Sequence, residues 1–92
     1  MYYECHITLG LHPKSARVLI EALNNWKYSS IEGDPDLGSG PREYATRRAS
    51  SNVALADVVA HMDKIALILN DEGYNVLRSK VELVMYDKRW KE

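Results

Sequence analysis

The segment that decides the fold is residues 2–9, which read Tyr2-Tyr3-Glu4-Cys5-His6-Ile7-Thr8-Leu9. Every second side chain in this segment is apolar or aromatic, and the side chains between them are mostly polar. An alternation with period 2 is typical of a β-strand that has one face in the core and the other in solvent. We therefore expect Cys5 in the core as a small apolar residue, and Glu4, His6 and Thr8 on the opposite face.

The next segment changes to a helical period. Its apolar stripe is Ala16, Leu19, Ile20 and Leu23, with Trp26 one turn further. Pro13 is expected as the first helical residue, because its missing N–H removes no hydrogen bond at that position.

A second helix follows further along the chain. Its stripe is Leu55, Val58, Val59, Met62, Ile65 or Ala66, and Leu69. Ser50 or Ser51 is expected as the N-cap, and Gly73 as the left-handed residue that ends the helix. His61 lies off the stripe, so we expect it to be solvated.

Three further strands are predicted at Trp26–Ile31, Tyr44–Ser50 and Asn75–Tyr86, and a charged tail at Asp87–Glu92. The stretch Glu32–Pro41 holds three glycines and two prolines in ten residues, which predicts a long turn without regular structure. The element order is βαββαβ. This order predicts one α+β domain over residues 1–92, a ferredoxin-like sandwich in which two helices cover one face of a four-stranded antiparallel sheet. Its spatial strand order is 4-1-3-2.

Composition excludes several classes of protein. Twelve Lys and Arg residues against thirteen Asp and Glu give a formal net charge of −1, which argues against a globally basic nucleic-acid binder. The one cysteine excludes an intramolecular disulfide framework and favours a cytoplasmic location. No apolar run approaches the roughly 18 residues of a membrane span. No spacing indicates a metal site, and no motif indicates a cofactor.

The predicted helices cover only one face of the sheet. On the last strand, Leu77, Val81, Leu83 and Met85 are expected beneath them, because a slip of one residue buries the charges instead. On the third strand Ala45 and Ala49 are expected beneath the helices and Arg47 at an edge. The predicted core is Leu19, Ile20, Leu23, Val58, Val59, Met62, Leu69, Ile7, Leu9, Val81 and Leu83.

The opposite, open face gathers chemically active side chains. An imidazole between a carboxylate and a hydroxyl can act as a general acid or base near neutral pH, so His6, Glu4 and Thr8 are the candidate catalytic residues. Cations beside them can hold a phosphate. The candidate ligand-binding residues are Arg78, Lys80, Glu82, Thr46, Arg48 and, from the Gly/Pro stretch, Asp34. The alternative is that these charges only form cross-strand pairs that stabilise the sheet.

Two resemblances follow from these motifs. His6-Ile7-Thr8-Leu9 resembles one H-x-T-x element of the 2H phosphoesterases, which act on phosphodiesters or cyclic phosphates, and this implies roles for His6 and Thr8. Glu4-x-His6-Ile7-Thr8, Gly33-Asp34-Pro35-x-Leu37-Gly38, Tyr44-Ala45-Thr46 and Arg78-x-Lys80-Val81-Glu82 together are similar to a group of small uncharacterised ferredoxin-like proteins. That second resemblance implies that the Gly/Pro stretch and the open face belong to one site.

The sequence therefore favours a small anionic or phosphorylated ligand on the open face, with acid/base chemistry at His6, and leaves open whether the chain is an enzyme. The alternative is a non-catalytic interaction module. It is expected to form a homodimer through a sheet edge, because stacking two charged faces costs several kcal/mol for each buried ion. RNA is a less favoured partner, since the basic stretch Pro41–Arg48, with three arginines and one tyrosine, lacks the paired aromatic residues of an RNA-binding sheet.

Overall fold

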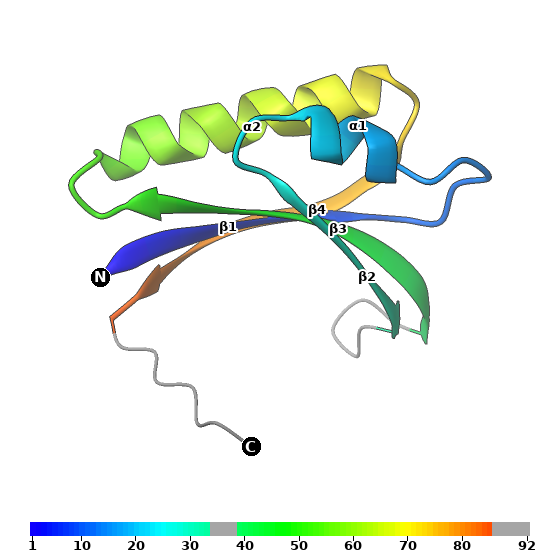
Figure 1. Ribbon diagram of the computed structural model, residues 1–92, viewed down its shortest axis with the longest axis horizontal. Helices are drawn as coiled ribbons and strands as arrows, with labels where there is room; N and C mark the ends of the chain where they lie inside the picture. Colours follow the sequence, from blue (N-terminus) through cyan, green and yellow to red (C-terminus); the bar gives the residue numbers. More distant parts are fainter. Residues whose placement is uncertain (34–38, 86–92) are drawn as a thin grey trace.

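The computed structural model describes the backbone of residues 1–33 and 39–85 and the side chains of residues 1–31 and 42–85. Four strands and two helices follow one another in this part of the chain (Figure 1). They are β1 (Tyr2–Leu9), α1 (Arg17–Ala22), β2 (Lys27–Gly33), β3 (Ser39–Ser50), α2 (Leu55–Asp71) and β4 (Val76–Val84).

The strands form one sheet in the order β2-β3-β1-β4, and every neighbouring pair is antiparallel. Both helices lie on the same face of this sheet, so its other face is left open (Figure 1). This arrangement confirms the predicted α+β ferredoxin-like fold and its strand order. β1 and β3 are the central strands, and β2 and β4 are the edges.

The core lies between the helices and the two central strands. Cys5, Ile7 and Leu9 of β1 are fully buried, and Ala45 and Ala49 of β3 lie beside them, as their alternation predicts. Burial raises the pKa of the Cys5 thiol, although the nearby Arg47 guanidinium opposes this shift. The helices and the segments around them contribute the remaining buried apolar side chains, which are Ala16, Ile20, Trp26, Val58, Met62, Ile65, Leu69 and Tyr74.

The expected burial of β4 is partly wrong. Val81 packs against the core, but Leu83 is 48% exposed, Leu77 39% and Met85 66%. A bulge shifts the pairing of β1 and β4, so that Thr8 faces Arg78 but Leu9 faces Val76. Val76 therefore packs on the core where Leu77 was expected. Among the other predicted core residues, Leu19, Leu23 and Val59 are only partly buried.

The placement of Arg47 also differs from the expectation. It does not lie at an edge of the sheet, because β3 is a central strand and Arg47 is paired with Cys5. Its side chain is half-buried on the helix face, and its Nε has no hydrogen-bond partner within the described structure. The guanidinium lies close enough to oppose the rise in the pKa of Cys5 that burial causes, and to add to the lowering of the pKa of His61 by burial.

Both helices begin later than predicted. Pro13 is not helical, since α1 starts at Arg17. The N-cap of α2 is Ala54 and not a serine, because Ser50 is engaged in the turn before the helix. There the Ser50 hydroxyl accepts the N–H of Asn52, and the Ser50 carbonyl accepts the N–H of Val53. Gly73 has a positive φ of 92° and follows the end of α2, as predicted.

Part of the Gly/Pro stretch is regular structure, contrary to the prediction of a long turn over Glu32–Pro41. β2 continues to Gly33 and β3 already begins at Ser39, with Gly33 paired to Ser39. β1 ends opposite Glu43, so the first residues of β3 pair only with β2. Pro41 lies where the β2–β3 pairing changes register, between the pairs Gly33–Ser39 and Ile31–Arg42. A strand tolerates a proline at such an irregularity, because no ladder hydrogen bond needs the N–H that proline lacks.

His61 is not simply solvated. Its side chain is half-buried, and its Nε2 accepts a hydrogen bond of 3.4 Å from Nε1 of the buried Trp26. The two rings are stacked with their centroids 6.1 Å apart. Burial lowers the pKa of His61, and the positive charges of Arg47 and Lys64 lower it further. His61 thus joins α2 to the start of β2.

The short helix α1 is attached to the sheet by Glu43 of β3. This carboxylate accepts hydrogen bonds from the Ser15 hydroxyl, the Tyr28 hydroxyl (2.6 Å) and the Ala16 N–H (3.2 Å). Burial acts to raise the pKa of Glu43, but these hydrogen bonds outweigh it and hold the pKa below its ordinary value. A helix of six residues is not stable alone, so α1 depends on this anchoring and on the packing of Ile20.

Glu43→Gln is expected to lower the free energy of unfolding at pH 7 by about 1–2 kcal/mol, because hydrogen bonds to a charged acceptor become neutral ones. A carboxyl with a lowered native pKa stabilises the fold above its unfolded pKa of about 4.3, and this contribution is lost as the pH falls through the native value. The difference in the free energy of unfolding between wild type and variant should therefore be largest above about pH 5 and should shrink as the pH falls below about 4. Urea unfolding across this range measures it. A gap that is independent of pH would contradict the role of the Glu43 charge.

Candidate functional site

The open face of the sheet is organised in rows that run across the strands. In the central row, Lys27 of β2 faces Thr46 of β3, Thr46 faces His6 of β1, and His6 faces Lys80 of β4. Residues opposite one another on neighbouring strands point to the same face. The register therefore sets an imidazole and a hydroxyl between two lysines.

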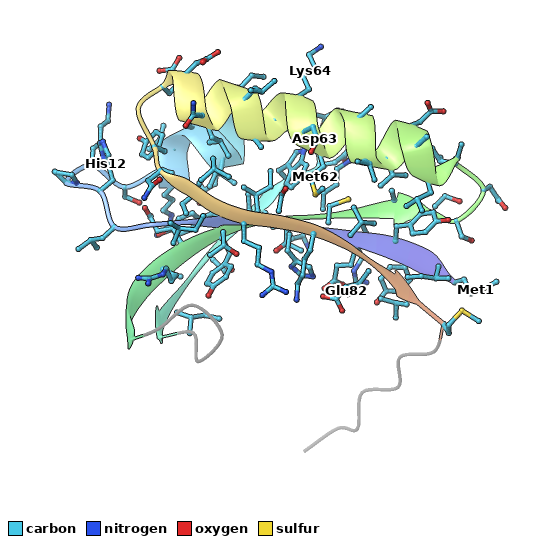
Figure 2. All side chains as sticks on the ribbon, turned by 180° about the vertical axis from the view of Figure 1, so that it is seen from behind. Met1, His12, Met62, Asp63, Lys64 and Glu82 are labelled. Atoms are coloured by element: carbon cyan, nitrogen blue, oxygen red, sulfur yellow. The ribbon has the colours of Figure 1, made fainter. Side chains whose placement is uncertain are left out.

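Two further rows flank the central one. On one side lie Ser29, Tyr44, Thr8 and Arg78, and on the other lie Arg48, Glu4 and Glu82. Figure 2 shows side chains projecting from the sheet on the side opposite α2, with Glu82 among them. We call the side chains of these three rows the open-face site.

Two adjoining hollows lie over these rows. The main pocket has a volume of about 390 Å³ and is lined by Glu4, His6, Thr8, Ser29, Ile31, Tyr44, Thr46, Arg78, Lys80 and Glu82. The side pocket has a volume of about 640 Å³ and is lined by Glu4, Asn25, Trp26, Lys27, Thr46 and Arg48. The two pockets share the lining residues Glu4 and Thr46, so they lie side by side over the open face.

His6 is held from both ring nitrogens. Its Nε2 lies 2.9 Å from Glu4 Oε1 and 3.5 Å from Glu82 Oε1, and its Nδ1 lies 3.3 Å from the Thr46 hydroxyl oxygen. Carboxylates only accept hydrogen bonds, so Nε2 carries a proton and donates a hydrogen bond to Glu4. Nδ1 accepts from the Thr46 hydroxyl when the ring is neutral and donates to it when both nitrogens are protonated. The side chain of His6 is 21% exposed, which leaves it within reach of a ligand in the main pocket.

The cations of the site are close to its two carboxylates. Lys80 Nζ lies 3.0 Å from Glu82 Oε1, and a hydrogen bond from Lys80 is the main reason why the pKa of Glu82 is lowered. Arg48 Nε lies 3.7 Å from Glu4 Oε2, and its guanidinium sits 4.7 Å from the centroid of the Tyr2 ring. With Lys27 and Arg78, the pocket linings present four cations against two carboxylates within the described residues.

Most of the sequence-predicted site residues come together. Glu4, His6, Thr8, Thr46, Arg78, Lys80 and Glu82 all line the main pocket, and Arg48 lines the side pocket. Thr8 is only 4% exposed, so it lies deep in the pocket between Tyr44 and Arg78. Asp34 lies outside the residues that the structure describes.

Sequence reasoning missed the part of the site contributed by β2. Lys27, Ser29 and Ile31 line the two pockets, as does Tyr44 of β3. The signal was present in the alternation of Lys27, Ser29 and Ile31 with Tyr28 and Ser30. The sequence does not reveal the register of β2 on β3, which is needed to place Lys27 beside Thr46.

No protein-family profile, no curated protein and no solved structure matches this chain. Residues 1–33 and 39–85 contain no group of three His, Cys, Asp or Glu side chains that could hold a metal ion. Neither of the two described helices is long and apolar enough to cross a membrane. A function must therefore be argued from the geometry and charges of the site.

Replacing Lys80 by Met is expected to raise the pKa of Glu82 toward its ordinary value, because the hydrogen bond and the positive charge of Lys80 both lower it. NMR titration of the Glu82 carboxyl measures the change. Lys64→Met is the matched control, since Lys64 is an exposed lysine of α2 that points away from the sheet (Figure 2). Equal Glu82 titration curves in wild type and Lys80→Met would contradict the pairing.

Proposed function

We propose that the open-face site binds a small anionic or phosphorylated ligand in the main pocket. The observation that carries the proposal is the position of His6, which is held by two carboxylates and a hydroxyl next to Arg78 and Lys80. A guanidinium offers a fork of N–H donors that matches a phosphate, and an ammonium adds a point charge. An anion in this pocket competes with Glu82 for Lys80.

The proposed chemistry at His6 follows from its contacts. Glu4 orients the ring by accepting a hydrogen bond from the Nε2–H group, and Thr8 adds a hydroxyl to the lining of the pocket. When both ring nitrogens are protonated, the imidazolium can give its Nε2 proton to an oxygen of a bound ligand. The neutral ring that remains keeps its proton on Nδ1 and can take a proton back at Nε2 near neutral pH. The resemblance to the 2H phosphoesterases adds His6 and Thr8 only, because no second histidine is among the described residues that line the main pocket.

The proposal requires no cofactor. We also place the protein in a reducing compartment such as the cytoplasm, because Cys5 is a free thiol buried in the core.

The double variant Arg78→Gln with Lys80→Gln tests the binding. A ligand at ten times its Kd stabilises the native state by about 1.4 kcal/mol, which corresponds to roughly 5–10 °C in Tm for a domain of this size. We expect this rise for the wild type with at least one probe among inorganic phosphate, nucleoside monophosphates, 2′,3′-cyclic nucleotides and short RNA. The double variant should lose it.

Arg17→Gln with Lys64→Gln is the matched control, because it removes one arginine and one lysine from the helices and not from the open face. It should keep the full rise in Tm. The proposal fails if no probe shifts the wild type, or if the control loses the shift as well. A shift with RNA alone would favour the less preferred RNA-binding function. Loss of phosphodiester cleavage in His6→Ala, with binding retained, would assign the acid/base role.

A second candidate function, a dimeric interaction module, is favoured by the edge strand β4. Leu77, Leu83 and Met85 are exposed along or just beyond this strand. An edge strand also presents backbone N–H and C=O groups that a second strand can pair with. The charges of β4 are complementary to those of a second copy of β4 that runs antiparallel to it.

The charges of β4 select one register for an antiparallel β4–β4 pair. With Val81 opposite Val81 of the second copy, each Lys80 faces a Glu82 across the interface, and Arg78 faces an uncharged Val84. Centring the pair on Lys80 or Glu82 sets like charges opposite one another, and centring it on Ser79 sets Arg78 against Lys80. Like charges opposite each other destabilise a sheet. In the Val81 register Leu83 faces the small Ser79 and Met85 faces Leu77, so that apolar surface is covered.

A charge swap tests this register. Lys80→Glu is expected to weaken the dimer about tenfold or more, because it sets two acidic pairs across the interface. Adding Glu82→Lys to the same chain restores opposite charges and should restore the dimer. Arg78→Glu is the control that leaves it unchanged. Sedimentation equilibrium at micromolar concentration measures all four proteins. A monomeric wild type, or a double variant as weak as Lys80→Glu, would contradict the proposed pairing.

A further inference from the structure

The side pocket makes the open-face site larger than a single anion requires. It has a volume of about 640 Å³, is lined by Lys27 and Arg48, and shares Glu4 and Thr46 with the main pocket. Arg48 is positioned by the Tyr2 ring, while its Nε stays 3.7 Å from Glu4, too far for a close hydrogen bond. This guanidinium can therefore turn its remaining N–H groups toward a ligand.

The cations of the two pockets come from different parts of the sheet: Lys27 and Arg48 from β2 and β3, and Arg78 and Lys80 from the opposite edge strand β4. Lys27 is on the edge strand β2 and Lys80 on the edge strand β4, in the same row. Three strand spacings separate them, about 14 Å between their backbones. Between them lie the Thr46 hydroxyl and the His6 imidazole, which are hydrogen-bonded to each other. The row thus has a lysine at each end and polar side chains between them, and the Glu4 carboxylate of the neighbouring row lines both pockets.

We infer that the ligand is a small molecule with two phosphate groups separated by a hydroxyl-bearing middle, of the class of sugar bisphosphates. This inference rests on the proposed function, since one phosphate occupies the main pocket at Arg78 and Lys80. Lys27 and Arg48 hold the second phosphate in the side pocket. Thr46 and His6 face the hydroxyls of the middle. Two phosphates on one molecule are favoured over two separate anions because binding of the first raises the effective concentration of the second.

Isothermal titration calorimetry with fructose 1,6-bisphosphate, fructose 6-phosphate and inorganic phosphate tests the inference. We expect the bisphosphate to bind on the order of tenfold more tightly, or better, than either probe with a single phosphate group. The variant Lys27→Gln with Arg48→Gln should lose this advantage and still bind fructose 6-phosphate within about twofold of wild type, because the main pocket is intact. Lys64→Gln with Arg17→Gln is the matched control and should keep the advantage. Unchanged thermal unfolding of each variant without ligand shows that the fold is retained.

The outcomes separate this inference from the proposed function. If the bisphosphate binds no better than fructose 6-phosphate, and both depend on Lys80, the two-phosphate inference is overturned and the single-anion function stands. If the control variant loses the advantage too, the side pocket is not the second subsite. If none of the three probes binds, the experiment counts against both proposals. If a tetranucleotide binds more tightly than the bisphosphate, the ligand is a nucleic-acid polymer and not a small molecule, and the two-phosphate inference is overturned.

Discussion

The rest of this structure depends on β1 being paired along both edges. A strand between two antiparallel neighbours has no freedom to slip, because a shift of one residue would move Cys5, Ile7 and Leu9 into solvent and Glu4 and His6 into the core. The burial of the odd-numbered side chains under the helices is therefore the same event that sets the even-numbered ones on the open face. The stability of the core and the geometry of the site have one cause.

This dependence explains how much could be predicted from the sequence. The alternation in β1 is strong enough to give its two faces, and the small size of Ala45 and Ala49 gives those of β3, so seven of the predicted residues meet in the main pocket. The errors occur where a tertiary contact overrides a local pattern. Because of the bulge beside Thr8, Val76 packs on the core in place of Leu77. The Ser50 hydroxyl, which was expected to cap α2, instead accepts a hydrogen bond within the preceding turn. Lys27 was missed because no local pattern reports which residue of β3 it faces.

The helix face has its own polar contacts, and these differ in kind from the ones on the open face. Glu43 is surrounded by the hydroxyls of Ser15 and Tyr28, and His61 receives the indole N–H of Trp26. Each of these groups is satisfied by neutral donors that attach an element to the sheet. On the open face, by contrast, carboxylates and cations lie in contact in pairs that an outside charge can exchange. That difference is the reason why the open face, and not the helix face, is the place to look for a ligand.

Lys80 takes part in both the proposed anion binding and the proposed pairing of β4. Its ammonium group now lies 3.0 Å from Glu82, which also lies 3.5 Å from His6. An anion in the main pocket would attract the Lys80 ammonium group away from Glu82. The Glu82 carboxylate would then keep only its contact with the His6 imidazole among the two given above. A second copy paired through β4 would instead bring another Glu82 to Lys80 and compete with the anion. Ligand binding and pairing of β4 are therefore expected to oppose one another through this one side chain, because a single ammonium group cannot neutralise two carboxylates and a phosphate at once.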